Sequence, residues 1–140
     1  MPKVLQGGIH TDERGILHFL NEFDMEQVKR FYSITHTDIE TKRGWRGHQI
    51  EQRWFYVVTG GFEIEYVKID DWNEPNPRLE IEVKSLSAID NQALHMPKGY
   101  ATRIRALVEN SRVILFSDYR IEHAKLDDHL WPIDYFKTKK

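Results

Sequence analysis

The sequence contains no cysteine. A disulfide scaffold, a thiol nucleophile and a cysteine-based zinc or iron–sulfur site are therefore excluded. The sequence also has no excess of basic residues, because 20 Lys and Arg stand against 22 Asp and Glu, for a formal net charge of −2. A nucleic-acid-binding domain normally has a basic balance, so we expect no nucleic-acid partner.

Long apolar runs are missing as well. No stretch reaches the ~18 apolar residues that a transmembrane helix needs, and the N-terminal residues lack the apolar core of a signal peptide. We therefore expect no membrane partner and a cytoplasmic location. The hydrophobic content of 40% and the aromatic content of 12% argue against disorder. A chain of 140 residues is long enough for one core, so we expect a single domain over residues 1–140.

The hydrophobic pattern has mostly a period of two residues, which is typical of β-strands. Its clearest segment is 53–69, where an apolar run enters Gly60 and Gly61 and three apolar side chains then alternate with Glu63 and Glu65. Two glycines accommodate the positive φ angles of a tight turn, so this segment predicts a β-hairpin.

Further apolar segments predict more strands, and two segments resemble short helices. The strands are expected at Lys29–His36, Leu79–Val83, Ala93–Met96, and as a pair at Ala101–Leu107 and Arg112–Ser117. Residues 70–77 contain two prolines and predict a loop. Helical turns are expected at Glu22–Lys29 and Ile121–Leu130, the second ended by Pro132. Many short strands in one chain favour an all-β sandwich or barrel.

The densest group of polar side chains lies at Lys42–Arg53, immediately before the predicted hairpin. In a strand, Arg46 and His48 project from the same face, because side chains alternate. If that face lines a barrel, a guanidinium suited to phosphate or carboxylate and an imidazole suited to proton transfer share one cavity. The alternative interpretation is a solvated polar edge strand.

Two other groups contain candidate functional residues. Pro97–Tyr100 predicts a tight turn and precedes Arg103 and Arg105, which share a face and are either anion ligands or solvated arginines. Tyr119 follows an apolar strand and is either a general acid or a buried tyrosine with one satisfied hydroxyl. Residues 12–15 (Asp-Glu-Arg-Gly) predict a turn.

The order of these motifs resembles the RmlC-like cupins that act on nucleotide-linked keto sugars. These are the dTDP-4-keto-6-deoxyglucose 3,5-epimerases and the 3,4-ketoisomerases (WxcM-like proteins). Residues 12–15 and 97–101 are similar to the Asp-x-Arg-Gly and Pro-x-Gly-Phe-Ala motifs of the epimerases. Residues 28–32, 43–48 and 117–119 resemble the ketoisomerase motifs Ile/Val-Lys-Arg-x-Tyr, Arg-Gly-x-His-Ala-His and Ser-Asp-Tyr-Tyr. The resemblance implies an RmlC-like β-barrel, or jelly roll, with short helical turns near the termini.

The sequence departs from these families at several functional positions. Arg46 replaces the first of the paired ketoisomerase histidines, and Thr102 replaces a later histidine of the epimerases. The acid tyrosine of the epimerases falls near Ile114 or Leu115, and Tyr119 is only its neighbour. His48 matches the catalytic base in either alignment. A ketoisomerase or a single-centre epimerase therefore fits better than a 3,5-epimerase.

The resemblance implies a role for each candidate residue. His48 removes a proton next to the C4 ketone, Arg46 or Arg53 stabilises the oxyanion, and Tyr119 is the nearest acid. The substrate-binding candidates are Arg14, Arg43 and Arg103 for the pyrophosphate, Trp45 or Tyr100 for the base, and Gln52. Arg14 would reach in from a partner subunit of an expected homodimer.

A metal and other cofactors are not expected, because the positions of the cupin metal ligands hold Arg46, His48, Gln52 or Arg53, and Thr102. Two other hypotheses remain. One is a non-catalytic cupin that binds a sugar nucleotide or assists a neighbouring enzyme. The other is a metal-dependent cupin dioxygenase.

Overall fold

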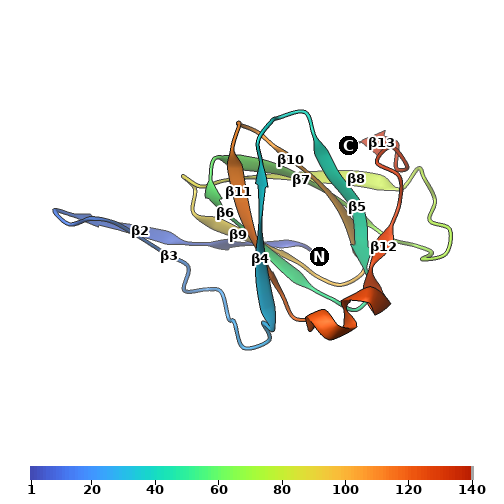
Figure 1. The fold of residues 1–140 in the computed structure, drawn as a ribbon, viewed down its shortest axis with the longest axis horizontal. Coiled ribbons are helices and arrows are strands. Elements are labelled where there is room, and N and C mark those ends of the chain that lie inside the picture. The colour runs from blue at the N-terminus through green and yellow to red at the C-terminus, as the bar shows by residue number, and fades with distance from the viewer. Residues whose placement is uncertain (140) are drawn as a thin grey trace.

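The structure is a computed structural model that describes residues 1–139. Within these residues, most strands belong to two sheets that face each other (Figure 1). The five-stranded sheet has the order β1 (Lys3–Gln6), β9 (Gln92–Met96), β6 (Arg53–Thr59), β11 (Ser111–Ser117) and β4 (Arg30–His36). The six-stranded sheet has the order β12 (His129–Leu130), β5 (Lys42–His48), β10 (Tyr100–Ala106), β7 (Gly61–Lys68), β8 (Glu80–Ser87) and β13 (Thr138–Lys139).

In residues 1–139, two strands and one helix lie outside these sheets. The strands β2 (Gly8–Asp12) and β3 (Gly15–Phe19) pair only with each other and form an arm that projects from the barrel (Figure 1). The 3₁₀ helix η1 (Ile121–Asp127) follows β11 and leads into β12. In the described part of the chain, no helix has the length and apolar character needed to cross a membrane.

The main core lies between the two sheets, as the period-two pattern predicts. Alternate residues of each strand point inward, among them Phe55 and Val57 of β6 and Phe62 and Ile64 of β7, all exposed by 2% or less. The outward faces are also partly covered. Trp45 and Phe136 belong to an apolar cluster on the six-stranded sheet, and Trp54 belongs to one on the five-stranded sheet. The all-β barrel predicted from the sequence is confirmed.

The predicted hairpin at Gly60 and Gly61 is wrong. Here β6 lies in the five-stranded sheet and β7 in the six-stranded sheet, so the glycines join two sheets instead of two paired strands. Gly60 has a φ of +71°, and its carbonyl accepts a hydrogen bond from the amide of Ala88 at 2.9 Å. The turn chemistry was recognised correctly, but a tight turn does not specify which strand becomes the neighbour.

The expected pairing of the next two strands is wrong for the same reason. β10 pairs with β5 and β7, whereas β11 pairs with β4 and β6. Two connections that resemble hairpins, β6–β7 and β10–β11, therefore cross from one sheet to the other. They lie at the same end of the barrel, because Gly60 is so close to Val108 and Ser111 that a side chain on Gly60 would collide with both.

The remaining local predictions are mostly confirmed. The strands expected at Lys29–His36, Leu79–Val83 and Ala93–Met96 correspond to β4, β8 and β9, and the turn at residues 12–15 joins β2 to β3. The helix expected at Glu22–Lys29 is wrong, because this segment has only turns, in which Val28 donates to the carbonyl of Met25. The second helix ends at Asp127, before the expected end at Leu130.

Candidate active site

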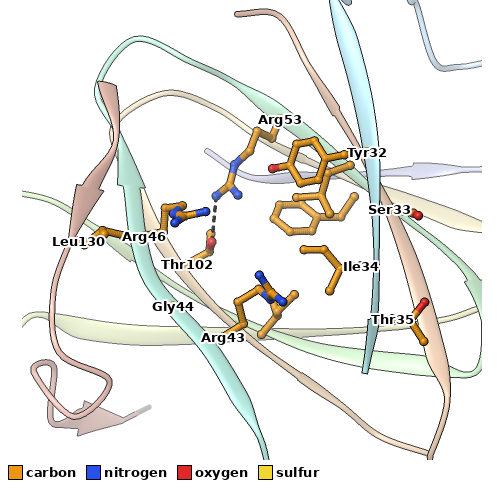
Figure 2. A pocket seen from close by; sticks show the side chains of 13 residues that line it. Tyr32, Ser33, Ile34, Thr35, Arg43, Gly44, Arg46, Arg53, Thr102 and Leu130 are labelled. Atoms are coloured by element: carbon orange, nitrogen blue, oxygen red, sulfur yellow. Dashed lines mark hydrogen bonds between the residues drawn. The ribbon is translucent and has the colours of Figure 1, made fainter. Parts of the chain in front are cut away.

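A cavity of about 480 Å³, here called the main cavity, lies between the two sheets. Its lining comes chiefly from β4, β5, β6 and β10. Figure 2 shows Arg43, Arg46 and Arg53 projecting into the space from β5 and β6, with Tyr32 and Ile34 facing them from β4. The cavity therefore combines several guanidinium groups with apolar and aromatic walls.

A bulge in β5 brings two of these arginines to the same face. Opposite β10, Thr102 pairs with Arg46 and Arg103 pairs with Gly44, so Trp45 is an extra residue in the ladder. In a regular strand, side chains three positions apart would point to opposite faces. The extra residue resets the alternation, and both Arg43 and Arg46 consequently line the main cavity.

Arg53 is the most unusual charge in the cavity. Its side chain is buried, with 4% of the residue exposed. Its Nη2 donates a hydrogen bond to the Thr102 hydroxyl at 2.8 Å, and the guanidinium carbon lies 5.0 Å from the Phe55 ring centroid. Within residues 1–139 it makes no ion pair at 4.0 Å or less, whereas Arg46 pairs with Asp128 at 3.0 Å. A buried guanidinium without a carboxylate is costly, and an anionic ligand would compensate that cost.

A smaller hollow of about 240 Å³, here called the inner recess, adjoins the main cavity. Tyr32 and Arg46 line both spaces, and His48 and Glu51 line the recess with them. The expectation that Arg46 and His48 share a face is therefore confirmed, because both face this recess. His48 itself contributes to the recess and not to the main cavity wall.

The orientation of the His48 ring is set by η1. Its Nδ1 lies 2.8 Å from the backbone carbonyl of Asp127, and because a carbonyl only accepts, Nδ1 carries the proton. Nε2 is then the unprotonated nitrogen. It is buried and has no hydrogen-bond partner among the described residues. A basic nitrogen is thereby presented without a competing donor.

The carboxylate of Asp127 holds the chain that follows His48. It accepts hydrogen bonds from the amides of Gln49, Ile50 and Glu51 at 2.7, 2.9 and 2.7 Å. One residue of η1 therefore fixes both the imidazole, through its carbonyl, and the β5–β6 connection, through its side chain. Sequence reasoning did not identify Asp127, because it lies 79 positions from His48.

Burial and the neighbouring charges keep His48 neutral. Burial is the largest cause, and Arg53 and Arg46 add to it, so the pKa of His48 falls from 6.5 to about 3. The ring is therefore in its unprotonated, basic form throughout the physiological pH range. A lower pKa also means that His48 is a weaker base in the unliganded protein.

This pKa shift predicts that His48 makes stability dependent on pH. Between pH 6.5 and about 3 the unfolded chain binds a proton at His48 that the folded chain resists, so stability falls as the pH is lowered. Each unit of pKa difference corresponds to about 1.4 kcal/mol. Between about pH 6 and pH 4, the wild type should lose roughly this amount per pH unit relative to His48→Asn. Denaturant unfolding at several pH values measures the difference, and parallel profiles would contradict the assignment.

Two of the predicted ligands lie on the opposite face of the six-stranded sheet. Trp45 is fully buried and packs against the Phe136 ring at 5.1 Å. Arg103 forms a two-point ion pair with Glu65, at 2.8 and 3.0 Å, and its guanidinium covers the Trp45 ring. The assignment of Trp45 and Arg103 to the substrate site is therefore corrected. They stabilise the outer apolar cluster.

Gln52 and Tyr119 also lie away from the recess. The side chain of Gln52 contacts His95 at 2.6 Å, on the outward face where His95 stacks on Trp54. The Tyr119 ring packs near His123, and it is the Tyr119 carbonyl that accepts a hydrogen bond from Arg30. The prediction of Tyr119 as the acid and Gln52 as a ligand is therefore corrected.

Tyr100 and Arg14 have different positions again. Tyr100 belongs to the main core and packs edge-on against Tyr66, at 6.1 Å between ring centroids. It therefore serves packing and does not present a free ring for stacking on a base. Arg14 lies at the tip of the β2–β3 arm, paired with Asp12 at 2.6 Å and with 83% of its side chain exposed. Within one chain it is remote from the cavity.

Besides Asp127, the site residues that the sequence did not indicate are Arg30, Tyr32 and Glu51. All three line the inner recess. Arg30 and Tyr32 belong to the motif at residues 28–32, and both lie on the inward face of β4. The two-residue alternation of this strand is the sequence signal that could have identified them. In the described range, no group of three His, Asp or Glu residues is arranged to hold a metal ion.

Comparisons with known proteins support the fold at low sequence identity. No model of a protein family matches the sequence, and no curated protein matches it. Among solved structures, an RmlC epimerase of Mycobacterium tuberculosis has a TM-score of 0.74 and 17% identity, over 92% of this chain and 68% of that chain. The 3′-monoepimerase ChmJ of Streptomyces bikiniensis, in complex with dTDP-quinovose, has a TM-score of 0.74 and 18% identity, over 95% and 76%.

A third structure is a mutant of the 3,4-ketoisomerase QdtA of Thermoanaerobacterium thermosaccharolyticum in complex with TDP-4-keto-6-deoxyglucose. It has a TM-score of 0.70 and 16% identity, over 91% of this chain and 85% of that chain. Epimerases and ketoisomerases of nucleotide sugars thus share the two-sheet architecture described above. The chain has the RmlC-like cupin fold.

Proposed function

We propose that this protein is an isomerase or epimerase that acts on a nucleotide-linked 4-keto-6-deoxyhexose, with dTDP as the expected nucleotide. The observation that carries the proposal is the combination of His48, whose Nε2 is unpaired within residues 1–139, with Arg53, a buried cation that forms no ion pair at 4.0 Å or less in that range. A base beside a cationic oxyanion site is what enolisation of a ketone requires. Support comes from three structural neighbours with this fold, which are named as an RmlC epimerase, a 3′-monoepimerase in complex with dTDP-quinovose and a 3,4-ketoisomerase in complex with TDP-4-keto-6-deoxyglucose.

The proposed reaction begins at the inner recess. His48 Nε2 removes the proton on the carbon next to the ketone, and the Asp127 carbonyl stabilises the imidazolium through Nδ1–H. Arg53 faces the developing oxyanion, and Tyr32, which lines both spaces, replaces Tyr119 as the hydroxyl nearest the sugar. Arg43 and Arg46 are the cationic ligands for the diphosphate. No metal or other cofactor takes part in these steps.

Substrate binding also resolves the low basicity of His48. Arg53 and Arg46 both lower its pKa in the free protein. An anionic diphosphate or enolate beside these arginines offsets their field, so the pKa of His48 rises when the substrate is bound. The base is therefore strengthened in the complex that needs it.

The second candidate function is a binding protein without turnover. The observation that favours it is Thr102, which occupies the place of an epimerase histidine and whose hydroxyl only accepts a hydrogen bond from Arg53. Incubation with dTDP-4-keto-6-deoxyglucose distinguishes the two. We expect a 3-keto isomer or a single epimer, identified by proton NMR. Tight binding of the unchanged sugar would instead favour the binding protein.

A homodimer completes the proposal. The β2–β3 arm exposes Ile9, Ile16 and Leu17 by 49, 63 and 60%, and it projects from the barrel (Figure 1). Apolar side chains on an arm of this kind are stabilised when a second copy covers them, and the same contact would bring Arg14 to the partner's cavity. We place the dimer in the cytoplasm, in deoxy-sugar synthesis for a surface polysaccharide.

If the β2–β3 arm forms the dimer interface, a charged side chain introduced on it should prevent dimerisation. Leu17→Lys should convert a dimer to a monomer, as measured by light scattering after gel filtration, because a lysine cannot be buried unpaired. Ile89→Lys is the matched control, since Ile89 is 82% exposed in the β8–β9 turn. If Leu17→Lys remains as dimeric as this control, the arm is not the interface.

A further inference from the structure

The inner recess contains a second buried group that the proposed reaction has not yet used. Glu51 is 2% exposed and lines the recess together with His48 and Tyr32. Its Oε2 is buried and, like the Nε2 of His48, has no hydrogen-bond partner in the part of the chain that the structure describes. Buried polar atoms normally have a hydrogen-bond partner, so two unpartnered atoms on residues that line one recess point to a polar group that binds there.

The other contacts of Glu51 hold it in place without neutralising it completely. Oε1 lies 3.4 Å from Nη2 of Arg30 and 4.0 Å from Nδ1 of His48. The backbone amide of Glu51 donates to Asp127. The Arg30 guanidinium is itself turned toward the Tyr119 carbonyl, to which its Nε donates at 2.9 Å. One oxygen of the carboxyl group is therefore held by Arg30, and the other has no hydrogen-bond partner among the described residues.

The charged neighbours of Glu51 come from every element around it. They are Arg30 on β4, His48 on β5, Arg53 on β6 and Asp127 on η1, with the Ser117 hydroxyl on β11. Burial is the largest influence and raises the pKa of Glu51, and Asp127 adds to this effect. Arg53, Ser117 and Arg30 act in the opposite direction but do not cancel it. The acid form is thus favoured beyond its usual pH range.

We infer that Glu51 enters the reaction as a carboxylic acid and transfers protons between the two sugar oxygens while His48 transfers the carbon proton. This inference rests on the proposed function and narrows it to ketoisomerisation. A ketoisomerase must move a proton between neighbouring oxygens as well as between neighbouring carbons. An epimerase leaves the oxygens as they are and needs no such group.

The steps balance without an oxidant or a further reactant. His48 Nε2 takes the C3 proton while the C3–H electron pair forms the C3–C4 double bond, and Glu51 gives its proton to O4. The product of this half is an enediol with hydroxyls on O3 and O4. The Glu51 carboxylate then takes the O3 proton as the C3 ketone forms, and the His48 imidazolium returns its proton to C4. Both side chains regain their starting forms.

The test is Glu51→Gln, which keeps the shape and an oxygen for Arg30 but has no transferable proton. With dTDP-4-keto-6-deoxyglucose in D₂O, we expect formation of the 3-keto product to fall by roughly 100- to 10,000-fold. Deuterium exchange at C3 should fall much less, because His48 remains. Glu63→Gln is the matched control, since Glu63 pairs with Arg105 at 3.6 Å, remote from the recess.

The outcomes separate this inference from the proposed function. Wild-type turnover by Glu51→Gln, or an equal loss of exchange and turnover, overturns the relay while the base and the oxyanion site remain. An epimer as the sole wild-type product also overturns it. In contrast, a wild type that neither exchanges the C3 proton nor forms an isomer or epimer overturns the proposed function itself. The pH dependence of turnover gives a further test. Wild-type turnover should fall as the pH rises and Glu51 loses its proton, and this fall should be absent in Glu51→Gln.

Discussion

Replacing His48 with asparagine should reduce turnover of a 4-keto-6-deoxyhexose nucleotide by at least about 100-fold, because a positioned base contributes roughly 100- to 10,000-fold. Asparagine retains an N–H that can donate to the Asp127 carbonyl, which His48 contacts at 2.8 Å. The β5–β6 connection should therefore keep its position. The variant removes the basic nitrogen and little else.

The measurement pairs initial rates with calorimetric binding of dTDP. Binding should stay within a few-fold of wild type, because Arg43 and Arg46 remain in the main cavity. His123→Asn is the control, since His123 is exposed and contacts Tyr119 outside the recess. Turnover by His48→Asn at the wild-type rate would remove His48 from the mechanism.

Replacing Arg53 with methionine should have opposite effects on activity and on stability. Loss of one donor to a developing oxyanion typically costs about 3 to 4 kcal/mol, or roughly 100- to 1,000-fold in rate. Yet Arg53 is 4% exposed, and in residues 1–139 no carboxylate pairs with it. Replacing a buried, poorly compensated charge with an apolar side chain is often neutral or stabilising by about 1 to 4 kcal/mol.

Two measurements on Arg53→Met test this account. Denaturant unfolding should give a free energy equal to or above that of wild type, while steady-state turnover falls. Arg112→Met is the control, since Arg112 is exposed on β11. A large loss of stability would mean that the bond to Thr102 makes Arg53 a structural residue. Unchanged turnover would mean that the oxyanion faces another group.

How far the sequence predicts this protein depends on the range of each interaction. Period-two alternation is a local property, and it identified β4, β8 and β9 and the shared face of Arg46 and His48. The turn at Gly60 was also recognised, but the partner of each strand is a long-range property. The crossing between sheets was therefore predicted as a hairpin.

The same distinction explains the errors at the site. Trp45 lies beside Arg46 in sequence, but alternation and the bulge direct it to the outer cluster, where it packs with Phe136. Asp127 meets Glu51 across 76 positions, so no local pattern indicates that it holds the recess together. The unpartnered Oε2 of Glu51 depends on how β4, β6 and η1 pack around it, and this packing is a property of the tertiary structure that no local sequence pattern encodes.

The most direct test of the central claim is deuterium exchange into the substrate by the wild-type protein. The sugar nucleotide dTDP-4-keto-6-deoxyglucose is incubated in D₂O, and proton NMR follows the signal of the hydrogen next to the ketone. The account predicts that this signal disappears with the wild type, through exchange with the solvent or through conversion to the isomer, and persists with His48→Asn. Saturated binding of the nucleotide by the wild type, with that signal unchanged, would contradict it.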